Sequence, residues 1–294
     1  MPPNPTINPT AVIAPGVKVP TSGSANPGYA CPVCSRATVA DPSTLNGYTL
    51  SRCMSCGYRF APTAFDVPVD YREVYTTEEY VESQVDPIGD AKARKAFRDM
   101  ATYRAFFDRL EVRPGARLLD VGCGVGRFCH AASDAGWNVV GIDVSPEAVS
   151  VGRKHARFPL HCGRLEQLPM ELAEFDVVTS FEVLEHLADP VALLVQMKGR
   201  VRMGGSVFFT VPNWDCPTVR QSSRADWVPP VHLGFHTLES VRSLASAAGF
   251  RSFLAGVVET DPFPQRLAPT LGWVRRRLGG VRSEPMGLWV HAVR

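Results

Sequence analysis

The sequence predicts a doubly wound α/β fold, in which helices cover both faces of a mostly parallel sheet, preceded by a smaller module. Three observations carry this prediction. Strand-like and helix-like segments alternate over 113–294, as parallel strands with crossover helices require. An apolar run ending in Asp120 leads into three glycines at alternate positions, which is typical of a strand that turns sharply into a helix beside a ligand. Two closely spaced cysteine pairs precede this region.

The individual elements follow from the spacing of apolar residues and from the residues that interrupt it. Apolar runs predict strands at 116–121, 138–143, 158–162, 174–181, 204–211, 250–259 and 286–293. Helical spacing predicts helices at 90–112, 125–136, 146–156, 189–202 and 237–248. Ser145, Pro146 and Glu147 suit the N-cap, first position and first turn of one helix. Gly204-Gly205 and Gly249 indicate helix ends.

Composition divides the chain into four parts. Residues 1–28 carry seven prolines and one charged side chain, so this segment should be a flexible leader. We expect a cysteine module at 29–62, a linker and helical segment at 63–112, and the main domain at 113–294. The main domain contains an unusual insert at about 262–284, with a helix expected near 271–278. The 294 residues suit one full α/β domain with a small appendage.

Charge and hydropathy give no sign of a nucleic-acid partner, a membrane span or secretion. The formal net charge of +2 makes no case for nucleic acid or a membrane surface as a partner. No apolar stretch approaches the ~18 residues that a bilayer span needs, and the N-terminus has no signal-peptide pattern. We therefore expect a cytoplasmic protein with no membrane contact. A homodimer is compatible with this composition.

Four of the eight cysteines form two C-x-x-C pairs, Cys31 with Cys34 and Cys53 with Cys56. Each pair can aim two thiolates at one tetrahedral ion, and the intervening residues suit a hairpin that brings the pairs together. The sequence therefore predicts a zinc ribbon with one structural zinc, in preference to disulfides or a redox motif. The other four cysteines are expected to be small buried residues: Cys123, Cys129, Cys162 and Cys216.

A second acidic strand end indicates a nucleoside site. The apolar run 138–142 ends in Asp143, where a carboxylate can accept hydrogen bonds from a ribose diol. The glycine spacing differs from the dinucleotide fingerprint G-x-G-x-x-G. Asp120 would repel a pyrophosphate but suits a ligand that carries an ammonium group.

The segment 118–128 contains D-x-G-x-G-x-G and resembles the first motif of class I S-adenosylmethionine (SAM) dependent methyltransferases. The resemblance implies a Rossmann-like seven-stranded sheet whose last strand is antiparallel to its neighbours. It implies that the glycines contact the methionine part of SAM, that Asp120 balances its ammonium and that Asp143 binds its ribose. Adenine would lie near 163–166, although the usual polar slot there reads Gly163-Arg164. The implied cofactor residues are Asp120, Gly122, Cys123, Gly124, Gly126, Asp143, Val144, Arg164, Leu165 and Phe181.

Two further segments contain candidate residues for orienting or deprotonating an acceptor. F-E-V-L-E-H at 181–186 resembles the E-V-L-E-H segment of small-molecule methyltransferases, and Glu182 and His186 would share one side of a helical turn. Residues 227–237 resemble W-x-P-P-x-H-x-x-x-F loops of methyltransferases in sugar and secondary metabolism. His186, His232 and Glu182 are therefore the catalytic candidates. The alternative is that Glu182 and His186 only line the pocket, and His236 is equally compatible with packing.

The combined prediction is a SAM-dependent methyltransferase for a small-molecule acceptor, a sugar or natural-product intermediate, with oxygen as the favoured target. A zinc-ribbon RNA methyltransferase is one alternative, but the predicted ribbon holds few basic residues, and phosphate binding needs a basic cluster. The basic run 275–277 in the insert is more typical of a solvated helix face. A non-catalytic adaptor is the other alternative, against which the complete set of Asp120, the glycines and Asp143 argues.

Overall fold

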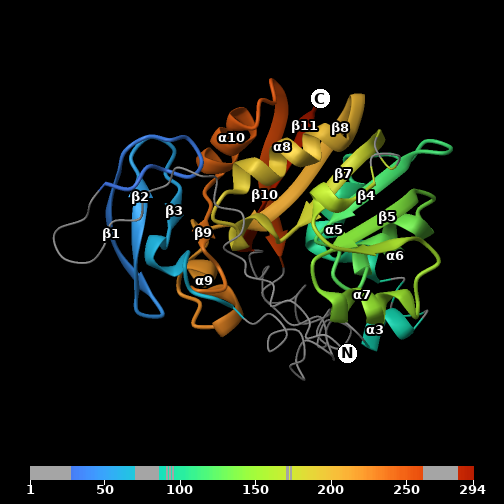
Figure 1. The fold of residues 1–294 in the computed structure, drawn as a ribbon, viewed down its shortest axis with the longest axis horizontal. Coiled ribbons are helices and arrows are strands. Elements are labelled where there is room, and N and C mark those ends of the chain that lie inside the picture. The colour runs from blue at the N-terminus through green and yellow to red at the C-terminus, as the bar shows by residue number, and fades with distance from the viewer. Residues whose placement is uncertain are drawn as a thin grey trace, which may run out of the picture.

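The structure is a computed structural model of the 294-residue chain. It describes residues 28–69, 86–90, 92, 94, 96–169, 172, 174–260 and 284–294. The predicted leader, much of the linker and the insert with its helix near 271–278 lie outside these residues. The described residues form a seven-stranded sheet with helices on both faces and a four-stranded sheet at one end of the long axis (Figure 1).

The seven-stranded sheet has the order β10-β11-β8-β7-β4-β5-β6. Its strands are β4 (Arg117–Val121), β5 (Asn138–Asp143), β6 (Leu160–Cys162), β7 (Phe175–Phe181), β8 (Val201–Pro212), β10 (Ser252–Thr260) and β11 (Glu284–Val293). Neighbouring strands from β8 to β6 are parallel, whereas β11 is antiparallel to both β10 and β8. This is the Rossmann-like sheet that the methyltransferase resemblance implies, including the inserted antiparallel strand.

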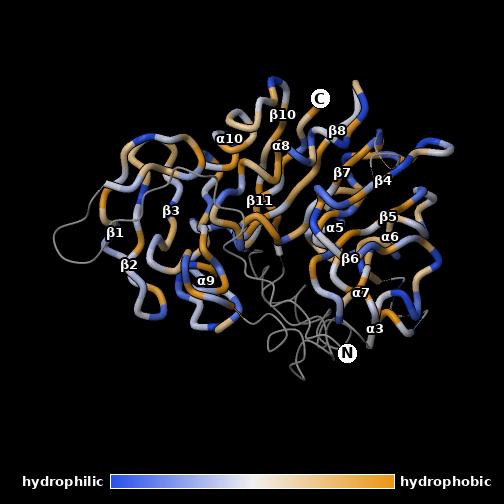
Figure 2. Tube along the Cα trace, viewed as in Figure 1, coloured by the Kyte–Doolittle hydropathy of each residue, from blue (hydrophilic) through white to orange (hydrophobic). Residues whose placement is uncertain are grey.

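Helices cover both faces because consecutive strand residues point to opposite sides. The main helices are α5 (Ala101–Phe107), α6 (Arg127–Asp134), α7 (Pro146–Arg153), α8 (Pro190–Arg200) and α10 (Leu238–Ala247). Leu119 and Phe209 belong to the core packed against α8 and α10. Their neighbours Leu118 and Phe208 belong to the core that contains Phe106 of α5. Figure 2 shows hydrophobic stretches along these central strands.

Two predicted boundaries are wrong for identifiable reasons. The single helix predicted over 90–112 is broken into the 3₁₀ turn η4 (Phe97–Asp99) and α5, because Met100 between them has extended backbone with φ −60° and ψ 134°. The short helix α3 (Asp86–Gly89) ends before this range. Gly204-Gly205 does not end a helix, since α8 stops at Arg200 and β8 begins at Val201. Gly205 instead lies in β8, with a virtual Cβ only 2.6 Å from the Asp176 carbonyl oxygen.

Both cysteine pairs lie beside the four-stranded sheet, and Cys53 is the last residue of one of its strands. Strands β1 (Thr38–Leu45) and β2 (Tyr48–Cys53) form an antiparallel hairpin, which turns at Asn46-Gly47 with positive φ at both positions. That dipeptide is the favoured sequence for a two-residue hairpin turn. Strand β3 (Arg59–Phe60) follows, and a short 3₁₀ turn, η2 (Pro62–Ala64), ends the segment.

The fourth strand of this sheet comes from the main domain. It is β9 (Gly234–Phe235), which pairs antiparallel with β3 and lies in residues 213–237, the β8–α10 loop. This loop also contains α9 (Pro217–Arg220) and the 3₁₀ turn η8 (Ala225–Trp227). Figure 1 shows β9 beside β3, with the four-stranded sheet next to the edge of the larger one. The cysteine module and the β8–α10 loop are therefore parts of one sheet.

Of the helices in the part of the chain that the structure describes, none combines the length and the apolar character that crossing a bilayer requires.

Candidate functional site

The glycine loop joins β4 to α6 at the point where the strand order of the large sheet reverses. Chain order runs from β4 outward to β5 and β6, and then returns to β7 on the other side of β4. Ligands of open α/β sheets bind at such a point, beyond the carboxyl ends of the strands. Gly122, Gly124 and Gly126 have φ values of 75°, 53° and 89°. Residues with side chains rarely adopt this region, so the loop shape depends on the glycines.

Gly122 also brings the segment after β7 against the loop. A Cβ on Gly122 would overlap the side chain of Val183. The close approach places residues 182–186 beside the glycine loop, although the two segments are far apart in the sequence.

Asp143 anchors the glycine loop to the end of β5. Its Oδ2 accepts a hydrogen bond from the Gly124 N–H at 2.7 Å, and its Oδ1 accepts one from the Ser145 N–H at 2.8 Å. A carboxylate has about four acceptor positions, so capacity remains for a ribose diol. Burial raises the pKa of Asp143, and these backbone hydrogen bonds oppose the rise.

Asp120 lies beneath the loop and is only 2% exposed. Its Oδ1 accepts a hydrogen bond from the Thr179 hydroxyl at 2.8 Å, and the Cys129 thiol donates to Oδ2 at 3.5 Å. Burial raises the pKa of Asp120 to about 7. A cationic ligand nearby would favour its ionised form, as the ammonium of SAM would.

The remaining cofactor candidates fall into two groups. Val144 is 46% exposed, directly after Asp143, where it can contact a ligand. Cys123 and Leu165 are buried, and Phe181 packs between Phe128 and Tyr103, with ring centroids 4.3 and 5.0 Å away. The Arg164 backbone N–H donates to the Gln167 side chain. The acidic strand ends and the glycine loop thus place hydrogen-bond acceptors and donors at one end of the sheet, beside the exposed apolar side chain of Val144.

The expectation that Glu182 and His186 share one helix face is wrong. Glu182 has φ 55°, Val183 has φ −129°, and only Leu184–His186 form a 3₁₀ turn, η7. The Glu182 carboxylate instead accepts a hydrogen bond from the Thr210 hydroxyl at 2.7 Å. Desolvation raises the pKa of Glu182 to about 7, and the hydrogen bond from Thr210 opposes the rise.

His186 and His232 come together from separate loops. Their ring centroids lie 4.7 Å apart with the ring planes nearly perpendicular. The Nδ1 of His186 lies 2.9 Å from the Val231 carbonyl oxygen, and the Leu233 N–H donates to the Glu185 carbonyl at 2.8 Å. The β8–α10 loop is thus fastened to the segment after β7.

Glu185 completes this group, which we call the Glu–His–His cluster (Glu185, His186 and His232). Sequence reasoning missed Glu185, although the second acidic residue of E-V-L-E-H could have indicated it. One ligand-type atom from each residue lies within 4.8 Å of the other two. Glu185 is 1% exposed, and neither carboxylate oxygen has a hydrogen-bond partner among the residues that the structure describes.

Burial sets the charge state of the cluster. Desolvation lowers the pKa of His186 and lowers that of His232 well below its usual value, with the neighbouring His186 adding to the second shift. Desolvation, followed by repulsion from Glu182, raises the pKa of Glu185. Both imidazoles are therefore neutral near pH 7.

His236 packs rather than facing the cluster. It is fully buried, its ring lies 4.7 Å from that of Tyr58, and burial lowers its pKa to about 3. Gly234 approaches the Tyr58 hydroxyl so closely that a Cβ would overlap it. The residue pair Tyr58 and His236 therefore fastens the β8–α10 loop to the cysteine module.

The four cysteines converge on one point, as the sequence predicts. Sulfur separations are 3.7 Å for Cys31–Cys56, 3.4 Å for Cys34–Cys53 and 3.6 Å for Cys34–Cys56. Sulfurs at about 2.3 Å from a tetrahedral zinc lie about 3.8 Å apart, whereas a disulfide is about 2 Å long. The Val33 and Ser55 N–H groups point at Cys31 and Cys53 sulfurs, which suits thiolates. The donor set fits a closed zinc site.

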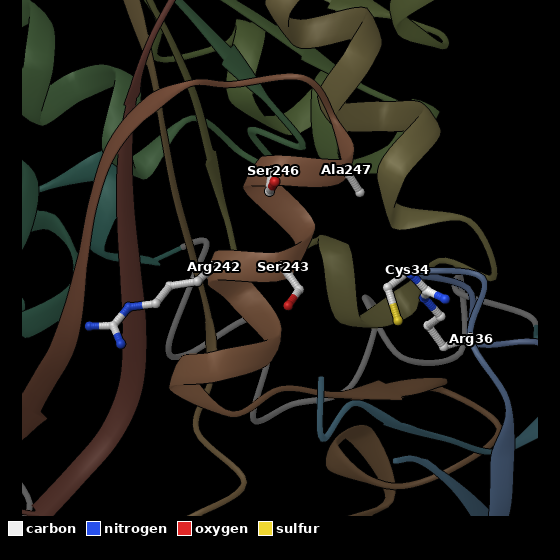
Figure 3. Close-up of a pocket in the computed structure, with 6 residues that line it drawn as sticks. All are labelled: Cys34, Arg36, Arg242, Ser243, Ser246 and Ala247. Carbon is white, nitrogen blue, oxygen red and sulfur yellow. The ribbon is translucent and has the colours of Figure 1, made fainter. Parts of the chain in front are cut away.

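A surface hollow lies between the cysteine module and α10 (Figure 3). Its lining residues are Cys34, Arg36, Arg242, Ser243, Ser246 and Ala247. Figure 3 shows the Arg242 side chain directed away from Cys34 and Arg36. No lining residue belongs to the glycine loop or to the Glu–His–His cluster, so the hollow marks a junction between two parts of the fold.

Comparison with known proteins identifies the family. A family described as a methyltransferase domain matches residues 92–253, more than half of the chain. The chain belongs to this methyltransferase family. The match covers the glycine loop, both acidic strand ends and the Glu–His–His cluster, and the chain is a SAM-dependent methyltransferase. Membership favours the enzyme over the adaptor alternative.

Curated relatives include two proteins named ubiquinone biosynthesis O-methyltransferase. The one from Aromatoleum aromaticum is 38% identical over 114 residues, covering 37% of this chain and 49% of that protein. The one from Idiomarina loihiensis is 34% identical over 126 residues, covering 39% and 52%. The chain thus spans about half the length of the curated relatives it matches.

Solved structures share the fold at low sequence identity. A SAM-dependent methyltransferase from Mesorhizobium loti has a TM-score of 0.50 at 21% identity, covering 67% of this chain and 100% of that one. The plantazolicin methyltransferase BpumL, in complex with a triazolic desmethylPZN analog and SAH, has a TM-score of 0.50 at 16% identity, covering 79% and 93%. These likenesses concern the fold alone.

Proposed function

We propose that this methyltransferase transfers the methyl group of SAM to a hydroxyl oxygen of a small molecule, a sugar or natural-product intermediate, held at the Glu–His–His cluster. The observation that carries the proposal is the position of the cluster. It follows β7, which pairs directly with β4, and Val183 in the same segment contacts Gly122 of the glycine loop. Cofactor and acceptor sites would therefore share one edge of the sheet.

Different residues of this chain would bind the cofactor and accept the proton of the acceptor. SAM, when bound, supplies a methyl group activated on a sulfonium. Asp143 would accept hydrogen bonds from the ribose and Asp120 would balance the ammonium. Positioning contributes most to an in-line displacement. The neutral His186 or His232 would accept the hydroxyl proton as the acceptor oxygen bonds to the methyl carbon and the carbon–sulfur bond of SAM breaks. Glu182, whose carboxylate accepts a hydrogen bond from Thr210, would lie beside the acceptor.

Oxygen as the target is supported by the relatives named O-methyltransferase and by two imidazoles that burial keeps neutral. A hydroxyl must lose a proton when it is methylated, and a neutral imidazole is the side chain suited to accept it. Within the described residues of the cysteine module, basic side chains are few, which supports a small-molecule acceptor over RNA.

The decisive experiment is single-turnover transfer from methyl-labelled SAM to a panel of phenols, catechols and sugar alcohols, with products located by NMR. We expect binding heat with SAM and labelled methyl on oxygen for at least one acceptor class. Label on nitrogen or carbon would contradict the proposed acceptor atom, and absence of SAM binding heat in folded protein would contradict the proposal altogether. Labelled RNA substrates serve as the comparison.

We also propose that Cys31, Cys34, Cys53 and Cys56 hold one structural zinc. Elemental analysis of freshly purified protein should give about one tightly held zinc per chain in the thiolate site. Cys53→Ser should lower that content and the thermal stability while leaving SAM affinity largely intact, because a structural zinc contributes folding free energy. Cys162→Ser is the matched control, since Cys162 is exposed, not buried as the sequence predicts, and lies far from the four paired cysteines in sequence. Zinc-free protein with unchanged stability would contradict the assignment.

A further inference from the structure

Glu185 presents an unusual electrostatic problem. Its carboxylate is almost fully buried, and neither oxygen has a hydrogen-bond partner among the described residues. A buried carboxyl group without a hydrogen-bond partner is costly, and its ionised form is very costly unless it is paired or coordinates a metal. The nearest nitrogen that could pair with it, the Nε2 of His186, lies 4.0 Å from Glu185 Oε1, beyond hydrogen-bond distance.

We infer that Glu185, His186 and His232 form a second metal site, which binds a divalent first-row transition ion independently of the cysteine site. Two imidazoles and one carboxylate form a recurrent ligand set for such ions, with three protein ligands and open positions. The bound cation would supply the positive charge that Glu185 lacks.

The orientation of His186 supports this assignment. Its Nδ1 lies 2.9 Å from the Val231 carbonyl oxygen, so Nδ1 carries the proton and donates it, while Nε2 keeps its lone pair. Histidines that bind metals are commonly held this way, with the second ring nitrogen donating to a carbonyl or carboxylate. The same Nε2 is the atom nearest to Glu185.

The geometry requires only a small contraction. The three ligand atoms lie within 4.8 Å of one another, and ligands at about 2.1 Å from one ion lie about 3–3.5 Å apart. Side-chain movements of about 1 Å would bring the three ligand atoms to this spacing. The backbone segments that carry the two histidines are already held together by hydrogen bonds. Trp227, stacked 6.5 Å from His232, covers one side of that ring.

The site would deepen the proposed function, on which this step rests. Open coordination positions would bind the acceptor hydroxyl, and the ion would lower the pKa of that hydroxyl. The O–H bond then breaks with the proton passing to water, and the oxygen keeps the electron pair that would bond to the methyl carbon. The carbon–sulfur bond would break at the same time, and its electron pair would return to the sulfur, which leaves as a neutral thioether. With the ion bound, the histidine nitrogens act as ligands and the ion replaces the general base.

The test uses full-length protein with zinc in the cysteine site, titrated with Co²⁺ in the absence of SAM and acceptor. We expect one additional Co²⁺ per chain, with visible bands of nitrogen and oxygen ligation and without a sulfur-to-metal charge-transfer band. Glu185→Gln and His232→Gln should each weaken this binding by at least ~100-fold, because losing a ligand costs at least as much as losing its outer-shell partner. The controls Glu239→Gln and His155→Gln alter exposed residues and should bind as the parent does.

Circular dichroism establishes whether each variant is folded, and His186→Gln provides a third ligand variant should one of the others unfold. Absence of additional Co²⁺ in the folded parent would overturn the inference, as would unchanged Co²⁺ affinity in folded Glu185→Gln. Because the titration contains no SAM, it can succeed even where methyl transfer fails, so failure of the metal site and failure of the proposed function are distinguishable.

Discussion

His186→Ala and His232→Ala are each expected to lower turnover by at least ~100-fold while SAM affinity stays near that of the parent. Loss of a general base costs about 10²–10⁴-fold in rate, and the loss of a ligand to the proposed ion would have a similar consequence. SAM affinity should persist because neither histidine belongs to the glycine loop or to the acidic strand ends. The measurement is single-turnover kinetics with a verified acceptor, alongside calorimetric titration with SAM.

The matched control is His155→Ala, which removes an exposed imidazole at the end of α7. Turnover of the parent should hold through neutral pH and fall only below the usual histidine range, since burial lowers the pKa of both cluster imidazoles. Near-parental turnover in both alanine variants would mean that positioning alone carries the reaction.

Asp143→Ala is expected to weaken SAM binding by at least ~100-fold. Two ribose hydroxyls would lose a charged acceptor, and each such hydrogen bond is worth about 1.5–3 kcal/mol, where 1.4 kcal/mol is about tenfold in affinity. The Gly124 and Ser145 N–H groups would lose their acceptor as well, so the glycine loop would also loosen. Calorimetric titration measures the affinity directly.

Ser145→Ala separates the two effects of that change. The Ser145 hydroxyl accepts from the Ala148 N–H as the N-cap of α7, and its loss should cost about 1 kcal/mol of stability. Asp143 would keep its carboxylate in this variant, so SAM affinity should fall far less than in Asp143→Ala. Equal SAM affinity in folded Asp143→Ala and the parent would remove Asp143 from the cofactor site.

Local patterns predicted the cofactor end of the sheet well. Strand β5 has the predicted bounds, and the glycine loop turns with positive φ at all three glycines. These features depend on residues close together in sequence, where backbone conformation and hydrophobic period leave few alternatives. Asp143 could be identified for the same reason, because it directly ends an apolar strand.

The acceptor end depends on contacts between distant segments. Glu182 has positive φ although it is not a glycine, and its bonds to Thr210 of β8 hold it there. The importance of Glu185 depends on His232, which belongs to another loop. Strand β9 has only two residues and no detectable period; it exists because β3 offers a free edge to pair with.

That two-residue strand has a consequence for the order in which the chain matures during synthesis. The β1–β2 hairpin and both cysteine pairs are local and can assemble as soon as they emerge. The open edge of β3 can pair only after Gly234 and Phe235 have been synthesised. The Asn46 side chain likewise donates a hydrogen bond to the Pro229 carbonyl, 183 residues later in the chain. Such distant pairings form slowly, and an unpaired edge invites association with other chains. A nascent chain that stalls before residue 234 would therefore display a folded cysteine module with an exposed strand edge that can pair with other chains.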